Sequence, residues 1–254
     1  MTWRRLGPAV LAGPDAVALP QALLDGMAPS GPPAASWSFV DRTVLVLGRA
    51  ARDPVLNLPA AERLGVDVVR RRSGGGPVLW DAELVSFDVV LPPGHPLADR
   101  DLAMAYRWIG EAVAEGIATL GVPVRVVGVE EAHAAQRRAD PASLRAARAC
   151  FGGLSPFEVV GPDDRKVVGL SQVRRRTGSL FQCGVPLSFD AALLAELLEP
   201  DPAERDALRD ALDGAATGLR SWVPGVRRED VVEAVEGALE RREGVRLVPD
   251  APAA

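Results

Sequence analysis

Short apolar runs separated by turn residues dominate the chain between residues 43 and 189 and predict a sheet. Such runs, ending at Gly or Pro, are typical of buried strands. We therefore predict strands at residues 43–48, 66–71, 84–92, 122–129, 157–160, 166–172 and 178–189. The turn sequence GPDD at 161–164 joins the fifth and sixth of these strands as a hairpin.

Apolar residues spaced three and four apart predict helices inside and after this sheet. Residues 99–120 have this spacing, and Gly121 marks the end of the predicted helix. Residues 130–149 lack this apolar spacing, so we predict a mobile surface segment there, with room for a helical turn. The sequence PSGPPAAS at 29–36 predicts a loop. The spacing after residue 190 predicts three helices, at about 190–199, 203–213 and 229–241.

Together these elements predict an α+β fold. A mixed sheet of six or more strands would occupy about residues 40–189, with one long helix inside it and a helical C-terminal tail. The length of 254 residues fits one large domain, or one domain with a small appendage.

The charge and hydropathy of the chain argue against two kinds of partner. The net charge is −5 and the pI is about 5.2, so no general basic field is available for nucleic acid. No apolar run approaches the roughly 20 residues that span a bilayer, and Gly and Pro interrupt the apolar patch near the N-terminus, unlike a signal peptide. We expect a cytoplasmic monomer that contacts neither nucleic acid nor membranes.

Lys166 is the only lysine among 29 basic residues. An ammonium is a compact charge, whereas a guanidinium is a broad fork. One interpretation is a site that needs a narrow cation, aimed at a developing oxyanion or a phosphate. The other is that the lysine has survived by chance on a hairpin. On a regular strand Lys166 would point away from Gly169 and Ser171, unless a bulge changes the alternation.

The sequence RRRSGGGPVLWD at 70–81 contains three consecutive glycines after a predicted strand. Glycines allow a ligand to approach the backbone and its N–H donors, and the flanking arginines and serine add side-chain donors. The segment suits a phosphate, a carboxylate or an acyl carbonyl, although a flexible turn is the alternative. Neither GxGxxG nor GxxxxGK[ST] is present. The candidate binding residues are Arg70, Arg71, Ser73, Gly74, Gly75 and Gly76.

Cys150 and Cys183 lack the spacing of a zinc site or a disulfide framework, so we predict free thiols and no metal. A thiolate at Cys150 is a candidate acyl-transfer nucleophile if cations lie nearby. The alternative is a small buried apolar residue, which is the favoured interpretation for Cys183. His95 and His133 have no neighbouring partner for a catalytic triad and are predicted to be loop residues.

In this order, the segments resemble the lipoate–protein ligase and octanoyltransferase family, whose catalytic domain is of the biotin/lipoate-ligase type. That family carries RRxSGGG followed by an apolar stretch and an Asp, then a KxxGxxQ-like segment with an essential lysine, then a strand that here reads LFQCG. The resemblance covers about residues 40–190. Its motifs lie at 70–81, at Lys166, Gly169 and Gln172, and at 180–184.

The resemblance implies a mixed, largely antiparallel sheet flanked by helices. Residues 1–190 would be the catalytic domain, and 191–254 a helical extension of the same domain. In the family the lysine contacts the carbonyl and phosphoryl oxygens of the acyl substrate or acyl-adenylate, which implies a catalytic role for Lys166. The further substrate-binding residues implied are Gly169, Ser171, Gln172 and Gly184.

The family includes two mechanisms: ligases activate lipoate with ATP, and transferases move an acyl group from a carrier without ATP. One branch of the transferases uses a cysteine just ahead of the lysine hairpin, and Cys150 occupies that position. We therefore expect transfer of an octanoyl or lipoyl group to a lipoyl-domain lysine through a Cys150 thioester. The alternative is an ATP-dependent lipoate–protein ligase that forms lipoyl-AMP and needs ATP and Mg. A second alternative is a non-catalytic relative that binds an acyl group or an adenylate.

The resemblance also implies the partners. The donor would be an acyl carrier protein, and the acceptor a lipoyl-domain protein or the carrier protein of glycine cleavage. No cofactor would be bound permanently. Trp80 and Cys183 occupy positions that are often His in the family, and Trp80 and Leu170 could narrow the acyl tunnel.

Overall fold

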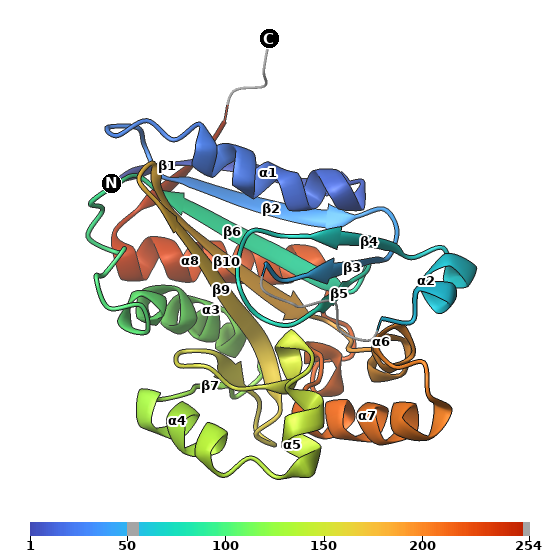
Figure 1. Ribbon diagram of the computed structural model, residues 1–254. Coiled ribbons are helices and arrows are strands. Elements are labelled where there is room, and N and C mark those ends of the chain that lie inside the picture. Colours follow the sequence, from blue (N-terminus) through green and yellow to red (C-terminus); the bar gives the residue numbers. More distant parts are fainter. Residues whose placement is uncertain (50–55, 251–254) are drawn as a thin grey trace.

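A computed structural model describes residues 1–49 and 56–250, and within them the strands form two sheets (Figure 1). The larger sheet has eight strands in the order β11-β1-β2-β6-β10-β9-β8-β7, and the smaller has three in the order β4-β3-β5. The strands of the larger sheet are β1 (Thr2–Leu11), β2 (Ala34–Val40), β6 (Leu84–Leu91), β7 (Arg125–Val126), β8 (Val159–Val160), β9 (Lys166–Arg175), β10 (Gly178–Pro186) and β11 (Arg246–Pro249). Those of the smaller sheet are β3 (Val44–Leu47), β4 (Asp67–Arg70) and β5 (Val78–Trp80).

The larger sheet is mixed and largely antiparallel, as predicted. Neighbouring strands from β2 through β7 run antiparallel, whereas β1 is parallel to both β2 and β11. In β6 all eight residues are buried. Its nearly continuous apolar run is explained by this position, because both faces of the sheet are covered.

Helices and the smaller sheet cover the two faces of the larger sheet (Figure 1). On one face lie α3 and α8, which share the largest apolar core with the strands. On the other face lie α1 and the smaller sheet, and the remaining helices gather at one end. The helices are α1 (Gly13–Asp25), α2 (Leu58–Leu64), α3 (Arg107–Thr119), α4 (Val129–Arg137), α5 (Pro141–Ala146), α6 (Ala191–Leu198), α7 (Pro202–Ala215) and α8 (Arg228–Glu243), with the 3-10 turns η1 (Met104–Tyr106), η2 (Cys150–Gly152) and η3 (Leu219–Ser221).

Helix α3 illustrates how the sequence pattern becomes packing. Ile109, Val113 and Ile117 recur at intervals of four and are completely buried, which gives the helix one apolar face. Gly116 allows α8 to approach the backbone of α3: a Cβ built on Gly116 would lie only 2.8 Å from the Cα of Val235.

Most of the predicted elements are confirmed. The strands of both sheets coincide with the predicted apolar runs, apart from β1, β2, β5 and β11, which were not predicted, and β9, which continues to Arg175. The single sheet predicted over about residues 40–189 is wrong, because β3, β4 and β5 form a sheet of their own. The helix predicted at 99–120 begins later, as η1 followed by α3. The predicted helical tail is present as α6, α7 and α8, and it then returns to the larger sheet as β11. Residues 251–254 of that tail lie outside the described residues.

Three local predictions are wrong. Residues 130–149 form α4 and α5 rather than a mobile surface segment; their buried faces consist of alanines, such as Ala132 and Ala146, which give no strong apolar periodicity. The segment 29–36 is not all loop, because β2 begins at Ala34. The strand predicted at 122–129 is reduced to the two residues of β7.

Candidate active site

The glycine segment and Cys150 lie together on the face of the larger sheet that carries the smaller sheet. Gly75 has φ +95°, a conformation that favours glycine. A Cβ built on Gly76 would lie 2.7 Å from the backbone nitrogen of Cys150, so only glycine permits this approach. The N–H of Cys150 donates to the carbonyl oxygen of Pro77 at 2.9 Å. These contacts fix η2 against the segment between β4 and β5.

The thiol of Cys150 opens into a small apolar cavity, which we call the thiol cavity. Cys150 is half-buried, and its Sγ lies 3.8 Å from Nη2 of Arg71. A guanidinium at this distance interacts favourably with negative charge that develops on the sulfur. The cavity volume is about 50 Å³, and its lining is formed by Val17, Val46, Arg71, Val78, Trp80, Leu84, Ser86, Cys150, Phe151, Gly169, Leu170, Ser171, Gln182, Cys183 and Gly184.

Lys166 is buried beneath the loop that carries the thiol, and only 1% of it is exposed. Its Nζ donates to the carbonyl oxygens of Cys150 at 2.8 Å and Gly153 at 2.9 Å. It also forms an ion pair with Oε1 of Glu158 at 2.7 Å. Since an ammonium has three donors, these three oxygens account for all of them. Lys166 therefore fastens η2 at both of its ends.

Glu158 completes this buried cluster. Burial raises the pKa of its carboxyl, while the attraction of Lys166 and hydrogen bonds from the protein oppose that rise. Oε1 accepts from the N–H of Leu170 at 3.1 Å and Oε2 accepts from the N–H of Ser155 at 2.7 Å. A buried charge without such partners would be strongly destabilising. The sequence signal for Glu158 was a carboxylate within an apolar strand, and we did not predict its role.

A bulge in β9 brings Lys166 to the same face as Gly169 and Ser171. Val159 pairs with Val168, but Val160 pairs with Lys166, so the register shifts at Val167. One extra residue reverses the alternation of side chains. Accordingly, a Cβ on Gly169 would lie 3.6 Å from Cε of Lys166. The strict alternation considered from the sequence does not hold here.

A chain of side-chain hydrogen bonds joins the glycine segment to the larger sheet. The hydroxyl of Ser171 donates to that of Ser73 at 3.2 Å, and Ser73 donates to Oε1 of Gln182 at 2.6 Å. Nε2 of Gln182 then donates to Oδ1 of Asp88 at 3.0 Å, and Ser86 donates to Oδ2 at 3.3 Å. The predicted residues Ser73 and Ser171 are therefore in direct contact. Gln182 connects them to the carboxyl of Asp88, which was not predicted as a site residue.

Burial dominates the electrostatics of this chain. It raises the pKa of Asp88 to about 7, against the opposing effects of Gln182, Ser86 and Arg71. Burial likewise raises the pKa of the Cys183 thiol, with smaller contributions from Asp88 and Glu158. A thiol with a raised pKa is a poor nucleophile, which agrees with the interpretation of Cys183 as a buried apolar residue.

Only some of the predicted site residues line the thiol cavity. The predicted binding residues that do not line it are Arg70, Ser73, Gly74, Gly75, Gly76 and Gln172, and Lys166 does not line it either. Gln172 follows Ser171 on β9 and points to the other side, where its Nε2 donates to the carbonyl oxygen of Leu102 at 2.7 Å. Arg70 donates to the carbonyl oxygen of Gly48 at 2.9 Å and does not line the cavity. Arg71 lines it, and its Nη2 also donates to the carbonyl oxygen of Gly74 at 2.9 Å.

The chemistry available here is that of a thiol beside a cation and an apolar cavity. A cysteine in this setting can attack an activated acyl carbonyl and hold the acyl group as a thioester. Within the described part of the chain, no three His, Cys, Asp or Glu residues are grouped so that they could hold a metal ion. None of the described helices is long and apolar enough to cross a membrane.

Comparison with known protein families identifies the class of protein. The family described as the lipoyl protein ligase A/B catalytic domain matches residues 13–240. The chain belongs to this family, which confirms the resemblance carried by the glycine segment and the lysine hairpin.

Individual relatives with similar sequences are named octanoyltransferases. The octanoyltransferase LipM of Kyrpidia tusciae is 32% identical over 215 residues, which cover 84% of this chain and 75% of the relative. The octanoyltransferase LipM of Geobacillus kaustophilus is 28% identical over 253 residues, covering 97% of this chain and 88% of the relative.

Solved structures share the fold at lower identity. A bipartite lipoate protein ligase from Thermoplasma acidophilum superposes with a TM-score of 0.78 at 18% identity, over 100% of this chain and 88% of that one. A lipoate-protein ligase A bound with ATP gives a TM-score of 0.72 at 17% identity, over 98% and 89%. These similarities confirm the predicted α+β architecture.

Proposed function

We propose that the protein is an octanoyltransferase of protein lipoylation that carries the acyl group on Cys150. The observation that carries this proposal is the setting of the thiol, which is half-buried, opens into an apolar cavity and lies 3.8 Å from a guanidinium nitrogen of Arg71. The relatives named octanoyltransferase LipM support the same reaction.

In the first step, the Cys150 thiolate attacks the carbonyl carbon of an octanoyl thioester. A bond forms from that carbon to Sγ, the bond to the donor sulfur breaks, and the donor leaves as a thiol after taking up a proton. In the second step, the amine of an acceptor lysine attacks the acyl-Cys150 carbonyl. An amide bond forms, the bond to Sγ breaks, and the amine proton returns to the cysteine. No ATP is needed, because the thioester stays activated throughout.

Lys166 acts in this proposal by orienting the nucleophile. Its ammonium holds the carbonyl oxygens of Cys150 and Gly153, so the backbone of η2 cannot turn the thiol away from the cavity. We also propose that the ammonium stabilises the oxyanion during the reaction, which requires that one of the two loop carbonyls gives up its hydrogen bond to Lys166. Pre-oriented groups of this kind contribute to rate because they need no rearrangement during the reaction.

We further propose an acyl carrier protein as donor and, as acceptor, a lipoyl-domain protein or the carrier protein of glycine cleavage, in the cytoplasm. The acceptor finds support in the Thermoplasma ligase, which was studied with its E2 lipoyl domain. A second candidate function, ATP-dependent lipoate ligation, finds support in the similarity to a ligase bound with ATP. Formation of AMP from lipoate and ATP would identify that second activity.

The test is to incubate the purified protein with an octanoyl thioester of a carrier protein and measure its intact mass. We expect one octanoyl adduct on the wild type and none on Cys150→Ala. An adduct of the same mass should still form on Cys183→Ala, which removes the other of the two cysteines. Subsequent addition of a lipoyl domain should move the adduct to that domain. An adduct that persists in Cys150→Ala would overturn the proposed nucleophile.

A further inference from the structure

Two glycines form a flat floor beneath the thiol. Gly169 of β9 and Gly184 of β10 are Cα partners across the two strands, and both line the thiol cavity. Neighbouring residues without side chains leave a trough on the surface of a sheet, into which another group can settle. Since Cys150 opens into the same cavity, an acyl tail attached to its sulfur would run over this floor.

The ring of Phe151 occupies that trough. A Cβ built on Gly169 would lie 3.2 Å from its Cζ, and one built on Gly184 would lie 3.5 Å from the same atom. The ring is 4% exposed, contacts Phe189 at a centroid distance of 5.9 Å, and lies 5.4 Å from Nζ of Lys166. Phe151 directly follows the proposed nucleophile, so its ring and the acyl tail compete for one space.

The remaining space is too small for an eight-carbon chain. The thiol cavity has about 50 Å³, which holds on the order of three or four water molecules. An octanoyl group has seven carbons beyond its carbonyl, and each of them needs volume comparable to a water molecule. The indole of Trp80 limits the cavity further, because Trp80 is 94% buried and lines the same space.

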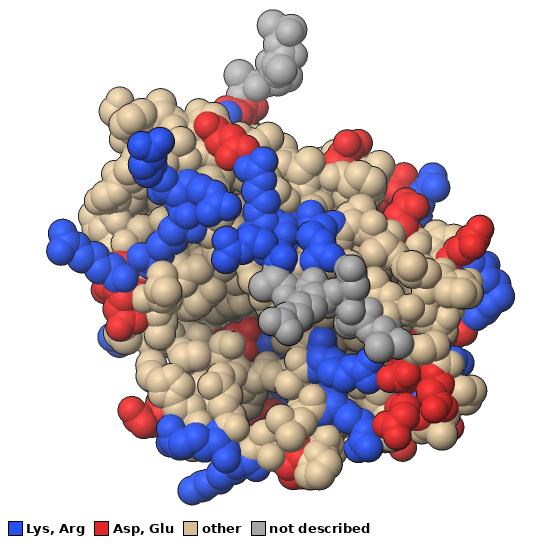
Figure 2. All heavy atoms as spheres, in the orientation of Figure 1, with Lys and Arg blue, Asp and Glu red and all other residues tan. Residues whose placement is uncertain are grey.

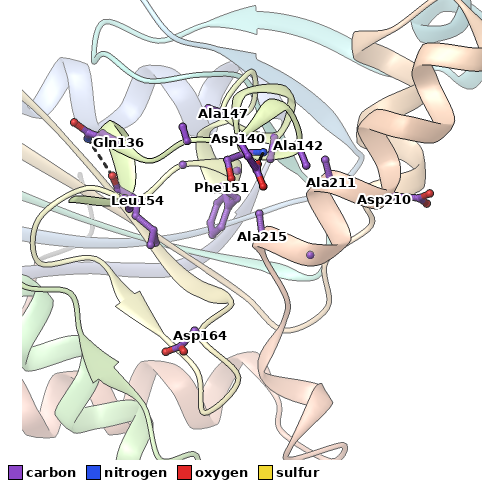
Figure 3. Close-up of a pocket in the computed structure, with 17 residues that line it drawn as sticks. Gln136, Asp140, Ala142, Ala147, Phe151, Leu154, Asp164, Asp210, Ala211 and Ala215 are labelled. Atoms are coloured by element: carbon purple, nitrogen blue, oxygen red, sulfur yellow. Dashed lines mark hydrogen bonds between the residues drawn. The ribbon is translucent and has the colours of Figure 1, made fainter. Parts of the chain in front are cut away.

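A second cavity offers room for the displaced ring. We call it the alanine cavity. Its volume is about 410 Å³, and it is lined mainly by small residues of α4, α5 and α7. Figure 3 shows Phe151 among its lining residues, with Ala147, Ala142, Ala211 and Ala215 around it. Phe151 lines both cavities, so a rotation of its side chain toward the alanine cavity would vacate the floor.

We propose that Phe151 determines which acyl chains the protein accepts, because its ring blocks the glycine floor and turns toward the alanine cavity when a longer chain enters. This inference rests on the proposed acyl transfer at Cys150. It predicts that a smaller side chain at position 151 opens the floor permanently. Longer and bulkier chains would then bind without displacing a ring.

The experiment measures the rate of Cys150 acylation by thioesters with chains of 6, 8, 10 and 12 carbons. The proteins compared are the wild type, Phe151→Leu, Phe151→Ala and the matched control Phe39→Leu. Phe39 is buried to the same extent as Phe151, at 4% exposed, and lines neither cavity. We expect the ratio of the 12-carbon to the 8-carbon rate to rise about tenfold or more in the Phe151 variants, since a single methylene in an apolar pocket discriminates by about tenfold or more. The control should keep the wild-type ratio. Phe151→Leu, the milder change, retains an apolar side chain and serves if Phe151→Ala does not fold.

Binding of free fatty acids, measured by calorimetry in a Cys150→Ser background, separates this inference from the proposed function. A shift toward longer acids in the Phe151 variants without any acylation of the parent would overturn the transfer reaction but support the role of Phe151. Acylation with an unchanged chain-length ratio would overturn the role of Phe151 alone. A crystal structure with bound octanoate and the ring still over Gly169 would also overturn it.

Discussion

The ammonium of Lys166 is held in a compact arrangement that joins β9 to the loop carrying Cys150. It lies among three oxygens, from Cys150, Gly153 and Glu158, at 2.7 to 2.9 Å. A guanidinium is wider and planar, and cannot direct its donors into the same compact arrangement. The chain uses arginine elsewhere, so this position is where the shape of the cation matters.

We expect Lys166→Arg to lower the rate of Cys150 acylation by about 100-fold, because a displaced η2 no longer presents the thiol correctly. The rate is measured by intact mass spectrometry with an octanoyl thioester. The matched control is Arg165→Lys, the reverse substitution at the half-buried neighbouring position, and it should leave the rate unchanged. Full activity of a folded Lys166→Arg protein would show that the site does not need an ammonium.

Asp88 makes a prediction about pH. Its pKa is about 7 in the folded protein against an ordinary value of 3.8, so the folded state holds a proton that the unfolded state has lost. The free energy of unfolding should therefore fall as pH rises from about 4 to about 7, and this contribution should level off above it. In Asp88→Asn that decline is absent, and between pH 5 and pH 8 this amounts to a difference of at most about 3 kcal/mol. Urea unfolding at pH 5 and pH 8 measures it, and equal pH dependence in both proteins would contradict the assignment.

Among the elements, the contact between α3 and α8 depends on one glycine. We expect Gly116→Ala to lower the free energy of unfolding by about 1 to 3 kcal/mol, because the added methyl group would collide with the backbone of α8. The matched control is Gly214→Ala in α7, where no atom lies within 4 Å of the new methyl group. That change should stabilise the protein by about 0.5 kcal/mol. Denaturation curves compare the two, and similar effects would argue against close packing.

The sequence pattern predicted elements best where large apolar residues carry it. Strands β6, β9 and β10 and helix α3 have Val, Leu, Ile and Phe at regular intervals, and all four were predicted, although α3 begins later than expected. By contrast, α4, α5 and β2 bury Ala and Ser, whose small side chains give little contrast between buried and exposed positions. The first strand was missed because Gly7 and Pro8 interrupt it, where the register to β2 also shifts.

The candidate site was predictable only as a set of residue types. Cys150, Arg71 and the three glycines come together, as the motifs suggested. The carboxylates behind the site, Glu158 next to Lys166 and Asp88 next to Gln182, could not be inferred, because a carboxylate in an apolar run does not reveal which distant group it contacts. Gln172 was assigned to the substrate, yet it lies on the opposite face of β9 from Ser171.

On the scale of the whole molecule, charge is unevenly distributed. The net charge is −5, yet Figure 2 shows arginine side chains gathered around a hollow on one face. The end of the β9–β10 hairpin carries three consecutive arginines, Arg174, Arg175 and Arg176. Within residues 1–49 and 56–250 none of these three has a carboxylate at ion-pair distance, and the last two are exposed. Such a patch suits a partner with an acidic surface.

We expect the double variant Arg175→Glu, Arg176→Glu to lower kcat/KM for a carrier-bound octanoyl donor about tenfold at low salt, since opposite charges steer association. Added salt should reduce the difference, because it screens exposed charges. A small octanoyl thioester should react equally with both proteins. The control is Arg137→Glu, Arg138→Glu at the end of α4. Equal losses in both double variants would argue against a localised docking surface.

The bulge in β9 has a consequence for comparing this chain with distant relatives. Lys166 and Ser171 are five residues apart, a spacing that places side chains on opposite faces of a regular strand. They nevertheless lie on the same face, because Val167 is an extra residue with no partner on β8. Removing that single valine would turn the lysine toward the layer of α3 and α8 and leave the thiol loop unanchored. An alignment gap placed at Val167 therefore signals a lost site, even when every motif letter is still present.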